Sequence, residues 1–310
     1  MIIFTLLSYL LISKLLRFLK LFFKYIVKEQ NAFLESLFEN NTDDYPTPTN
    51  LTFAWGFGTY AGTCLAFQIL SGISLAMHYT PDISLAFHSI IHIMLNVKNG
   101  WLIRDIHAYG ASMFFILVYI YIFRGLYFGA YMRPRQVLWC SSIIIFILML
   151  FTAFTGYVLP WSQLSFWIAK GFSNVFAGLP IIGNSMLDWL WGNFPVNVIL
   201  KRFFNIHFFL SFVLVGITII HLILVYKYDS ANSLGTKRDE DKIEFYPYFF
   251  DKDLFAFSVF FFVFIVLVYF YPNTLSLAAN SIPADSTYTQ PPIVPQWYFL
   301  RAPSNLHTAC

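Results

Sequence analysis

Five long apolar stretches constrain the fold more than any other feature of the sequence. Each is long enough for a helix to cross about 30 Å of hydrocarbon, because a helix rises about 1.5 Å per residue. Charged residues make up 11% of the chain, well below the roughly 25% of a soluble domain. The sequence therefore predicts an all-α, polytopic transmembrane helix bundle, with spans over residues 53–77, 109–128, 137–158, 205–226 and 254–271.

The segments outside these spans indicate how the chain meets the membrane surface. Residues 1–28 are apolar but carry five spaced cations, which predicts an interfacial amphipathic helix rather than a signal peptide. Residues 160–200 mix Pro, Gly and charge, which predicts short helices on one membrane surface. Thirteen of the 19 Lys and Arg residues fall on the side of the amino terminus, which places that side inside. The small net charge of +3 gives no indication of nucleic-acid binding.

Two histidines share the fourth span. His207 and His221 are fourteen residues apart, so on a helix they lie ~21 Å apart along the axis and about 40° apart around it. A histidine inside a membrane is costly and is therefore a functional candidate, although a hydrogen bond between helices also explains a single one. Two on nearly one face suit two stacked haems, each with axial nitrogen ligands.

Small residues and a second histidine repeat this spacing. Small residues recur at fourteen on the first span and on the third, which suits clearance for a macrocycle, with ordinary helix packing as the alternative. His107 would partner His207 at an outer level, whereas the residue fourteen further on is Tyr121. The small pairs are Gly58 with Gly72 and Ser142 with Gly156.

Arginines flank these positions at the membrane ends. Arg104, Arg202 and Arg124 would clamp haem propionates, or would equally serve as snorkelling, topology-setting charges. The three cysteines form no CxxCH motif, so any haem would be bound non-covalently.

Several ordered motifs carry a specific resemblance. The chain between about Trp55 and Leu300 resembles mitochondrial cytochrome b of respiratory complex III, a quinol–cytochrome c oxidoreductase. The motifs are LAMHYT, GWLIRDIHAYGASMFF, GYVLPWSQLSFW, RFFNIHFFLSFVLVGITIIHL, DKIEFYPYFFDKD and TLSLAANSIPADSTYTQPPIVPQWYFL.

The resemblance implies a catalytic subunit of a multi-subunit, dimeric complex in the mitochondrial inner membrane, with its amino terminus on the matrix side. It implies two non-covalent haem b groups, with ubiquinol oxidised at an outer site and quinone reduced at an inner one. The implied partners are a Rieske iron–sulfur protein, a cytochrome c1-type subunit and membrane lipid.

The resemblance also assigns residues to sites. His107 and His207 would hold the outer haem and His221 the inner one, with Arg104 and Arg202 at outer propionates and Arg124 at an inner one. The outer quinol pocket would use the helix 162–174 and the loop from Pro295, and the inner quinone pocket would use a rim of polar residues. Solvated charge is the alternative reading of that rim's lysine and aspartate. The named residues are Tyr157, Gln296 and Tyr298 at the outer site and Ser230, Lys252 and Asp253 at the inner.

Four positions depart from the family. Tyr121 stands where the family has the second ligand of the inner haem, which predicts a five-coordinate or weakly Tyr-coordinated iron. Gln296 replaces a Glu and cannot accept a proton at neutral pH, so proton release must use Tyr, water, a propionate or the iron–sulfur protein's histidine. Ile168 replaces a Gly and narrows the outer pocket, and Tyr226 replaces a His of the inner quinone site.

Four segments are expected. They are an amino-terminal extension (1–50), a four-helix di-haem core (51–228), an inner loop with the fifth span (229–273), and an outer loop with the PQWY motif (274–310). After Leu300 the sequence does not resemble the family's last three spans, and three explanations stay open: an incomplete chain, a separate polypeptide that supplies them, or their loss. The rival interpretations are a haem b membrane anchor of another quinone-linked oxidoreductase, a transporter, and a degenerate, structural cytochrome b.

Overall fold

The computed structural model describes residues 46–177, 183, 185, 188, 197–228, 241–272, 274, 278–287 and 296–299. They divide into two compact units, which are treated separately below. The smaller unit comprises Met1–Thr49 and Arg238–Lys252, and the larger comprises Asn50–Lys237 and Asp253–Cys310. The predicted interfacial helix (1–28), Ser230 and the segment from 300 to 310 lie outside the described residues.

The described part of the smaller unit is a short antiparallel pair of strands, β1 (Pro46–Pro48) and β2 (Lys242–Glu244), with Pro46 opposite Glu244. The larger unit is helical. Its elements are η2 (Phe53–Trp55), α2 (Phe57–Ala76), α3 (Ala86–Asn96), α4 (Gly100–Tyr127), α5 (Gln136–Val158), α6 (Gln163–Ala177), α8 (Asn197–Tyr228), α9 (Tyr248–Phe270, from Asp253 onward), η3 (Ala278–Ser281) and η4 (Trp297–Phe299).

Five of these helices are long and apolar enough to cross a membrane, as the sequence predicts. The main difference is the start of α4, which begins at Gly100 rather than at residue 109. The extra turns carry Arg104 and the buried Asp105, whose side chains form an ion pair of 2.8 Å. Because the buried carboxylate is paired, this polar turn continues the helix, and His107 lies within it.

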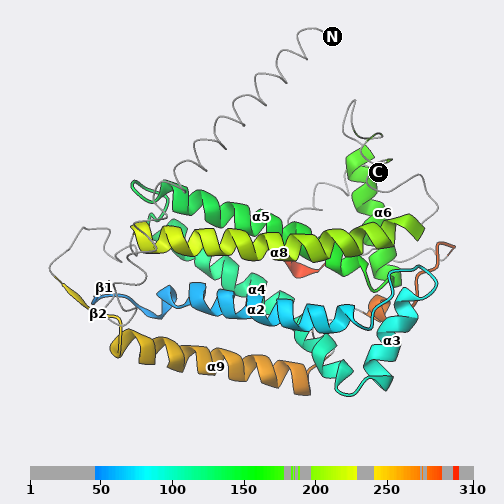
Figure 1. The fold of residues 1–310 in the computed structure, drawn as a ribbon, viewed down its shortest axis with the longest axis horizontal. Helices are drawn as coiled ribbons and strands as arrows, with labels where there is room; N and C mark the ends of the chain where they lie inside the picture. The colour runs from blue at the N-terminus through cyan, green and yellow to red at the C-terminus, as the bar shows by residue number, and fades with distance from the viewer. Residues whose placement is uncertain are drawn as a thin grey trace, which may run out of the picture. The chain divides into compact units, whose positions relative to one another are not determined.

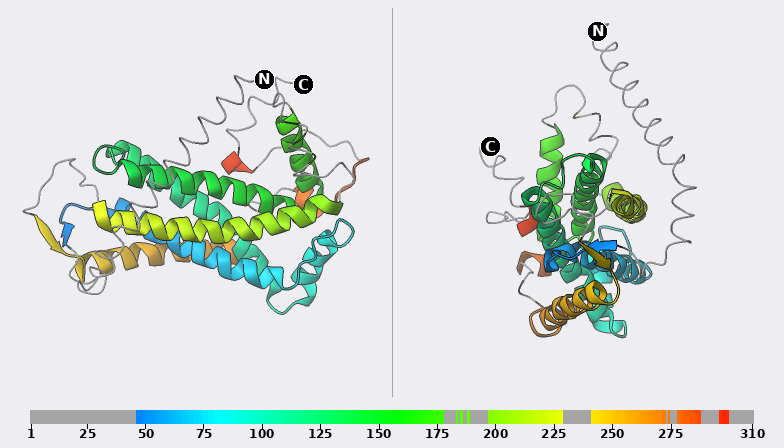
Figure 2. Two further views of the ribbon diagram at one scale, coloured as in Figure 1. Left: turned by 45° about the horizontal axis from the view of Figure 1, so that its top comes forward. Right: turned by 90° about the vertical axis from the view of Figure 1, so that its left-hand side faces the viewer.

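The four spans predicted as the core pack in two pairs. Helix α2 lies against α4, and α5 lies against α8 (Figures 1 and 2). Each pair brings one histidine-bearing helix against one helix with the repeated small residues. The sequence repeat of fourteen therefore becomes a repeat along the length of the bundle.

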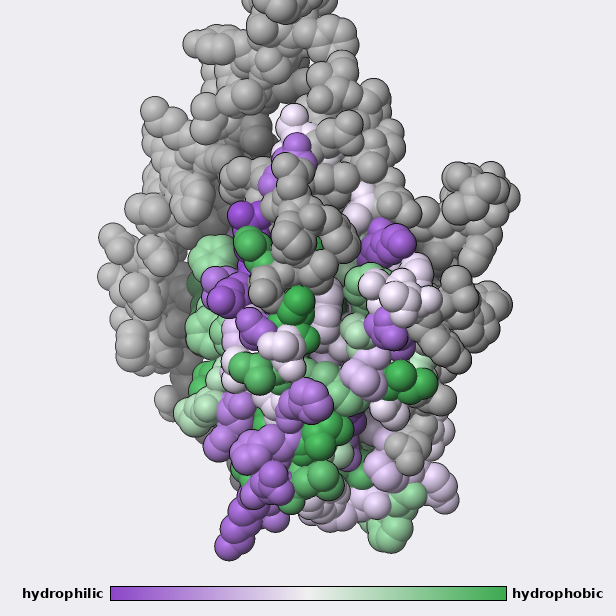
Figure 3. Space-filling model, turned by 90° about the vertical axis from the view of Figure 1, so that its right-hand side faces the viewer, coloured by the Kyte–Doolittle hydropathy of each residue, from purple (hydrophilic) through white to green (hydrophobic). Residues whose placement is uncertain are grey.

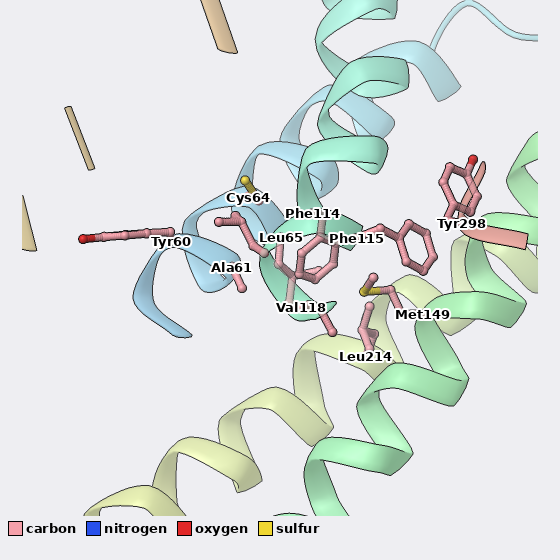
Figure 4. Packing of buried hydrophobic residues seen from close by; sticks show 11 residues of the cluster. Tyr60, Ala61, Cys64, Leu65, Phe114, Phe115, Val118, Met149, Leu214 and Tyr298 are labelled. Atoms are coloured by element: carbon pink, nitrogen blue, oxygen red, sulfur yellow. The ribbon is translucent and has the colours of Figure 1, made fainter. Parts of the chain in front are cut away.

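An apolar layer fills the middle of the bundle (Figure 4). Each of the four helices contributes one buried residue that lies seven positions from both members of its fourteen-residue pair. Seven residues correspond to about 10 Å of helix, so this layer separates two levels of the bundle. Its members are Leu65, Phe114, Met149 and Leu214.

Two shorter helices, α3 and α6, follow the spans α2 and α5. Helix α6 confirms the predicted helix 162–174, and it begins where Ser162 Oγ accepts the backbone N–H of Ser165 at 3.2 Å. Helix α3 is not foreseen from the sequence, because its eleven residues are too few to form a membrane span. On the face that carries these helices, hydrophilic and hydrophobic side chains are interspersed (Figure 3), as expected near a membrane surface.

Candidate functional site

Two histidines face each other near one end of the bundle and are called the outer pair. They are His107 on α4 and His207 on α8, with ring centroids 6.3 Å apart and planes at 76°. Each ring lies against a glycine of a neighbouring helix, where that helix has no side chain. A Cβ at Gly72 would lie 3.1 Å from Cε1 of His107, and one at Gly156 would lie 2.5 Å from Cε1 of His207. Gly72 and Gly156 thus make room for the imidazoles, whereas clearance for a macrocycle edge at these glycines stays a prediction.

The protons of the outer pair can be assigned from its hydrogen bonds. Ser71 Oγ donates its single proton to the Phe67 carbonyl at 2.6 Å, so it accepts from Nδ1–H of His107 at 2.9 Å. Nδ1 of His207 donates to the Thr152 carbonyl at 2.8 Å. Both rings therefore carry an unprotonated Nε2, the form in which imidazole binds a metal, with the second nitrogen oriented by a neighbour.

A second pair, called the inner pair, lies fourteen residues further along the same two helices. Tyr121 takes the place of a histidine opposite His221, and its hydroxyl lies 3.0 Å from Nε2 of that ring. Nδ1 of His221 contacts Ser141 Oγ at 2.8 Å. A Cβ at Gly58 would lie 3.3 Å from the Tyr121 ring, so the small residue on α2 again backs the facing side chain.

The arginines occupy different surroundings. The Arg124 guanidinium lies over the Tyr121 ring, 4.7 Å from its centroid, and over Trp55 at 5.3 Å. Arg104 is paired with Asp105. Arg104 lies within one helical turn of His107, and Arg124 lies within one turn of Tyr121.

A polar network surrounds Tyr157 at the outer end of α5. The Tyr157 hydroxyl oxygen accepts from Nδ2 of Asn280 at 3.0 Å and from Nε2 of Gln296 at 3.3 Å. Asn280 Oδ1 in turn accepts from Ser162 Oγ at 3.1 Å, at the start of α6. The structure thus brings together Tyr157, the surface helix and the PQWY segment, which the sequence assigns to one pocket.

Tyr298, of the same PQWY segment, is buried and rigidly packed. Its ring stacks on Phe115 with centroids 4.3 Å apart and an interplanar angle of 6°. Burial raises the pKa of the Tyr298 phenol, and the neighbouring Tyr157 raises it further. Tyr298 therefore stays protonated at neutral pH, and its ring is a packing group rather than a base.

Two carboxylates at this end of the bundle are already engaged by hydrogen-bond donors. Hydrogen bonds from Thr287 hold the pKa of Asp285 below its usual range. Asp105 is committed to Arg104. Neither Asp285 nor Asp105 is thus free to accept a quinol proton in place of the Glu that Gln296 replaces.

The residues predicted for the inner quinone pocket fall in two different units and in a segment outside the described residues, so this pocket stays a prediction. Lys252 belongs to the smaller unit, where its ammonium lies 5.6 Å from the Tyr248 ring centroid. Asp253 belongs to the larger unit, and its backbone carbonyl accepts from the Tyr60 hydroxyl at 3.1 Å. Ser230 lies outside the described residues.

Comparison with known proteins decides the family. Residues 42–229 match the cytochrome b/b6/petB family. The chain belongs to the cytochrome b family. It is 55% identical to cytochrome b of Phytophthora megasperma over 268 residues, or 86% of this chain and 70% of the relative. It is 50% identical to cytochrome b of Solanum tuberosum, with 86% and 68% covered.

A solved structure of a hyperthermophilic respiratory complex III matches this cytochrome b with a TM-score of 0.79 and 33% identity, over 88% of this chain and 73% of that one. The predicted resemblance to cytochrome b of complex III is thereby confirmed, and so is the helical membrane fold. The chain is a membrane-embedded electron-transfer protein. The anchor and transporter interpretations are set aside.

The residues that orient the histidines and the Tyr157 hydroxyl were not identified from the sequence. Ser71, Ser141 and Thr155 each precede one of the repeated small residues, and Thr155 Oγ1 lies 3.5 Å from Nδ1 of His207. A hydroxyl residue directly before each of these small residues could have indicated these hydrogen bonds from the sequence. Asn280 carried none, because a polar residue in a loop is usually solvated.

Gly156 offers a direct test of this packing. We expect Gly156→Ala to lower the haem content of the purified complex to less than about half, because the new methyl meets the His207 ring. Gly216→Ala on α8 is the matched control, since a Cβ there meets nothing within 4 Å. Haem per chain, measured from the pyridine-haemochrome spectrum, should fall only in the first variant; equal values in both would refute the clearance role.

Proposed function

We propose that this cytochrome b is the catalytic core of a ubiquinol–cytochrome c oxidoreductase, with quinol oxidation at the outer site and quinone reduction at the inner one. The observation that carries the proposal is the outer pair, with two unprotonated Nε2 atoms on facing helices and Nδ1 of each ring tied down. Two b-type haems would lie along the electron path.

The chain's residues fit a haem at the outer pair. His107 and His207 would supply the axial nitrogens, Gly72 and Gly156 would clear its edge, and Arg104 with Arg202 would meet its propionates. When bound, haem supplies an iron that takes up and releases one electron. The hydrogen bonds to Nδ1 fix ring orientation and raise ligand basicity.

The apolar layer at the middle of the bundle supports the same function. Leu65, Phe114, Met149 and Leu214 are buried, and their side chains offer no hydrogen-bonding groups. A proton has no relay of polar groups through them, whereas an electron does not need one. The layer therefore favours electron transfer between the two levels without a proton leak.

At the outer site, Tyr157 is placed to bind quinol rather than to remove its proton. Its oxygen accepts amide N–H groups from Asn280 and Gln296, and its own O–H makes a long contact of 3.5 Å with Asn280 Oδ1. A quinone oxygen at a shorter distance would replace that contact as the acceptor of the Tyr157 proton. The substrate's protons would leave to water or to the iron–sulfur partner. The inner pocket would use Ser230, Lys252 and Asp253, whose charge pair suits proton uptake during reduction.

Tyr157→Phe should raise the KM for quinol about tenfold, because one hydrogen bond to the substrate is worth about 1.4 kcal/mol. Tyr127→Phe is the control, since that side chain is 84% exposed at the end of α4. Steady-state cytochrome c reduction against quinol concentration measures both. An unchanged KM in Tyr157→Phe would remove that residue from the pocket.

The proposed setting is the mitochondrial inner membrane, with the amino terminus on the matrix side. The proposed partners are a Rieske iron–sulfur protein and a cytochrome c1-type subunit in a dimeric complex. The test is quinol–cytochrome c turnover by the purified complex, together with its reduced-minus-oxidised spectrum. Inhibitor-sensitive turnover with b-type bands supports the proposal, and b-type bands without turnover would leave a structural cytochrome b.

A further inference from the structure

The inner pair is joined by a hydrogen bond whose proton can be placed. Ser141 Oγ donates its single proton to the Leu138 carbonyl at 2.7 Å, so its contact with Nδ1 of His221 at 2.8 Å has the ring N–H donating. Nε2 of His221 is therefore unprotonated. The Tyr121 hydroxyl must then donate to it across 3.0 Å.

This arrangement differs from the outer pair in one respect. His107 and His207 each present an unprotonated Nε2, and neither can satisfy the other without an electron-pair acceptor such as a metal. Tyr121 instead brings its own proton to His221. Of the two inner residues, His221 thus offers a nitrogen that can bind a metal, and Tyr121 offers a hydrogen-bond donor.

The distance shows that both inner residues cannot coordinate one iron where they stand. Two trans ligands at about 2 Å from a metal lie ~4 Å apart, whereas the Tyr121 oxygen lies 3.0 Å from Nε2 of His221. A phenol is longer than an imidazole, so its oxygen reaches into the space that the metal would occupy. An iron bound to His221 therefore displaces the hydroxyl instead of capturing it.

The surroundings favour His221 as the ligand that stays and Tyr121 as the side chain that yields. The His221 ring is buried, with 8% exposed, and is anchored by Ser141. The Tyr121 ring packs against Gly58 of α2 and lies under the Arg124 guanidinium, which also hydrogen-bonds its hydroxyl. Tyr121 therefore keeps a polar partner when its hydroxyl moves away from His221.

We propose that a haem at the inner level is held by His221 alone, and that Tyr121 stands over the opposite face as a hydrogen-bond donor. The sixth position of the iron is then a binding site for a small exogenous ligand of the carbon monoxide, nitric oxide or cyanide class. The outer pair offers no such site, because two imidazoles close it. The inference rests on the proposed function in one respect, since it requires a second haem at the inner level.

The test uses the whole purified complex, reduced with dithionite and titrated with carbon monoxide. Haem b per chain is counted first, and the reduced-plus-CO minus reduced spectrum is then recorded. We expect two haems per chain and a response from about half of the haem b. Tyr121→His should abolish the response by supplying a second nitrogen, and Tyr121→Phe should keep it, because the hydroxyl is not a ligand.

Each other outcome has a distinct meaning. Two haems per chain without a CO response would overturn the open position and leave the proposed function intact. One haem per chain would overturn both, because the inner carrier would be missing. A CO response that survives in Tyr121→His would move the open position away from the inner level, and so overturn the assignment to Tyr121.

Discussion

His207→Leu is expected to remove the outer haem and to reduce quinol–cytochrome c turnover to below about 1% of the wild-type rate. The unprotonated Nε2 of this ring is one of two facing ligands, and leucine offers no electron pair to a metal. One imidazole alone holds a non-covalent haem poorly. The haem count of the purified complex should therefore fall by one per chain, as measured from the pyridine-haemochrome spectrum.

Phe208→Leu is the matched control for this change. Phe208 is the next residue on α8, is 45% exposed, and points away from the pair in helical phase. Its replacement by the same residue should leave haem content and turnover unchanged. If His207→Leu retained full haem content, the outer pair would be a structural contact and the proposed electron path would lose its first carrier.

Gln296→Glu is expected to accelerate quinol oxidation by roughly 10- to 100-fold, the scale of a general base placed within reach of the reacting proton. The amide at this position lies 3.3 Å from the Tyr157 hydroxyl, so the new carboxylate would sit beside the bound quinol. It acts only when ionised. The gain should therefore appear as pH rises through the pKa of the new carboxyl and should vanish below it.

Gln136→Glu provides the control, because it makes the same change at an exposed position at the start of α5. Turnover against pH should then show a new ascending limb only in Gln296→Glu. Parallel profiles in all three proteins would mean that this position does not contact the reacting hydroxyl. The protons would in that case leave by a route that bypasses the PQWY segment.

The spans and the paired levels follow from the sequence because they depend on periodicities that one helix imposes by itself. Fourteen residues return a helix to nearly the same face, so His207 and His221, or Gly58 and Gly72, could be aligned without knowing their neighbours. The start of α4 was misplaced because hydropathy penalises Arg104 and Asp105 separately. Their ion pair cancels that penalty only in the folded chain.

The hydrogen-bond partners could not be obtained in this way. Asn280 reaches Tyr157 across 123 residues of sequence, and nothing local to either residue indicates the contact. The same holds for Tyr121, whose replacement of a ligand was evident from the motif. That its hydroxyl lies too close to His221 for both to bind one iron required the distance.

The central claim is that the two levels of the bundle have different ligation. Electron paramagnetic resonance of the oxidised, purified complex measures this most directly, because bis-imidazole haem gives a low-spin signal and a five-coordinate haem gives a high-spin one. We predict one signal of each kind per cytochrome b, with the low-spin signal lost in His207→Leu. Two low-spin bis-imidazole signals in the wild-type complex would contradict the account.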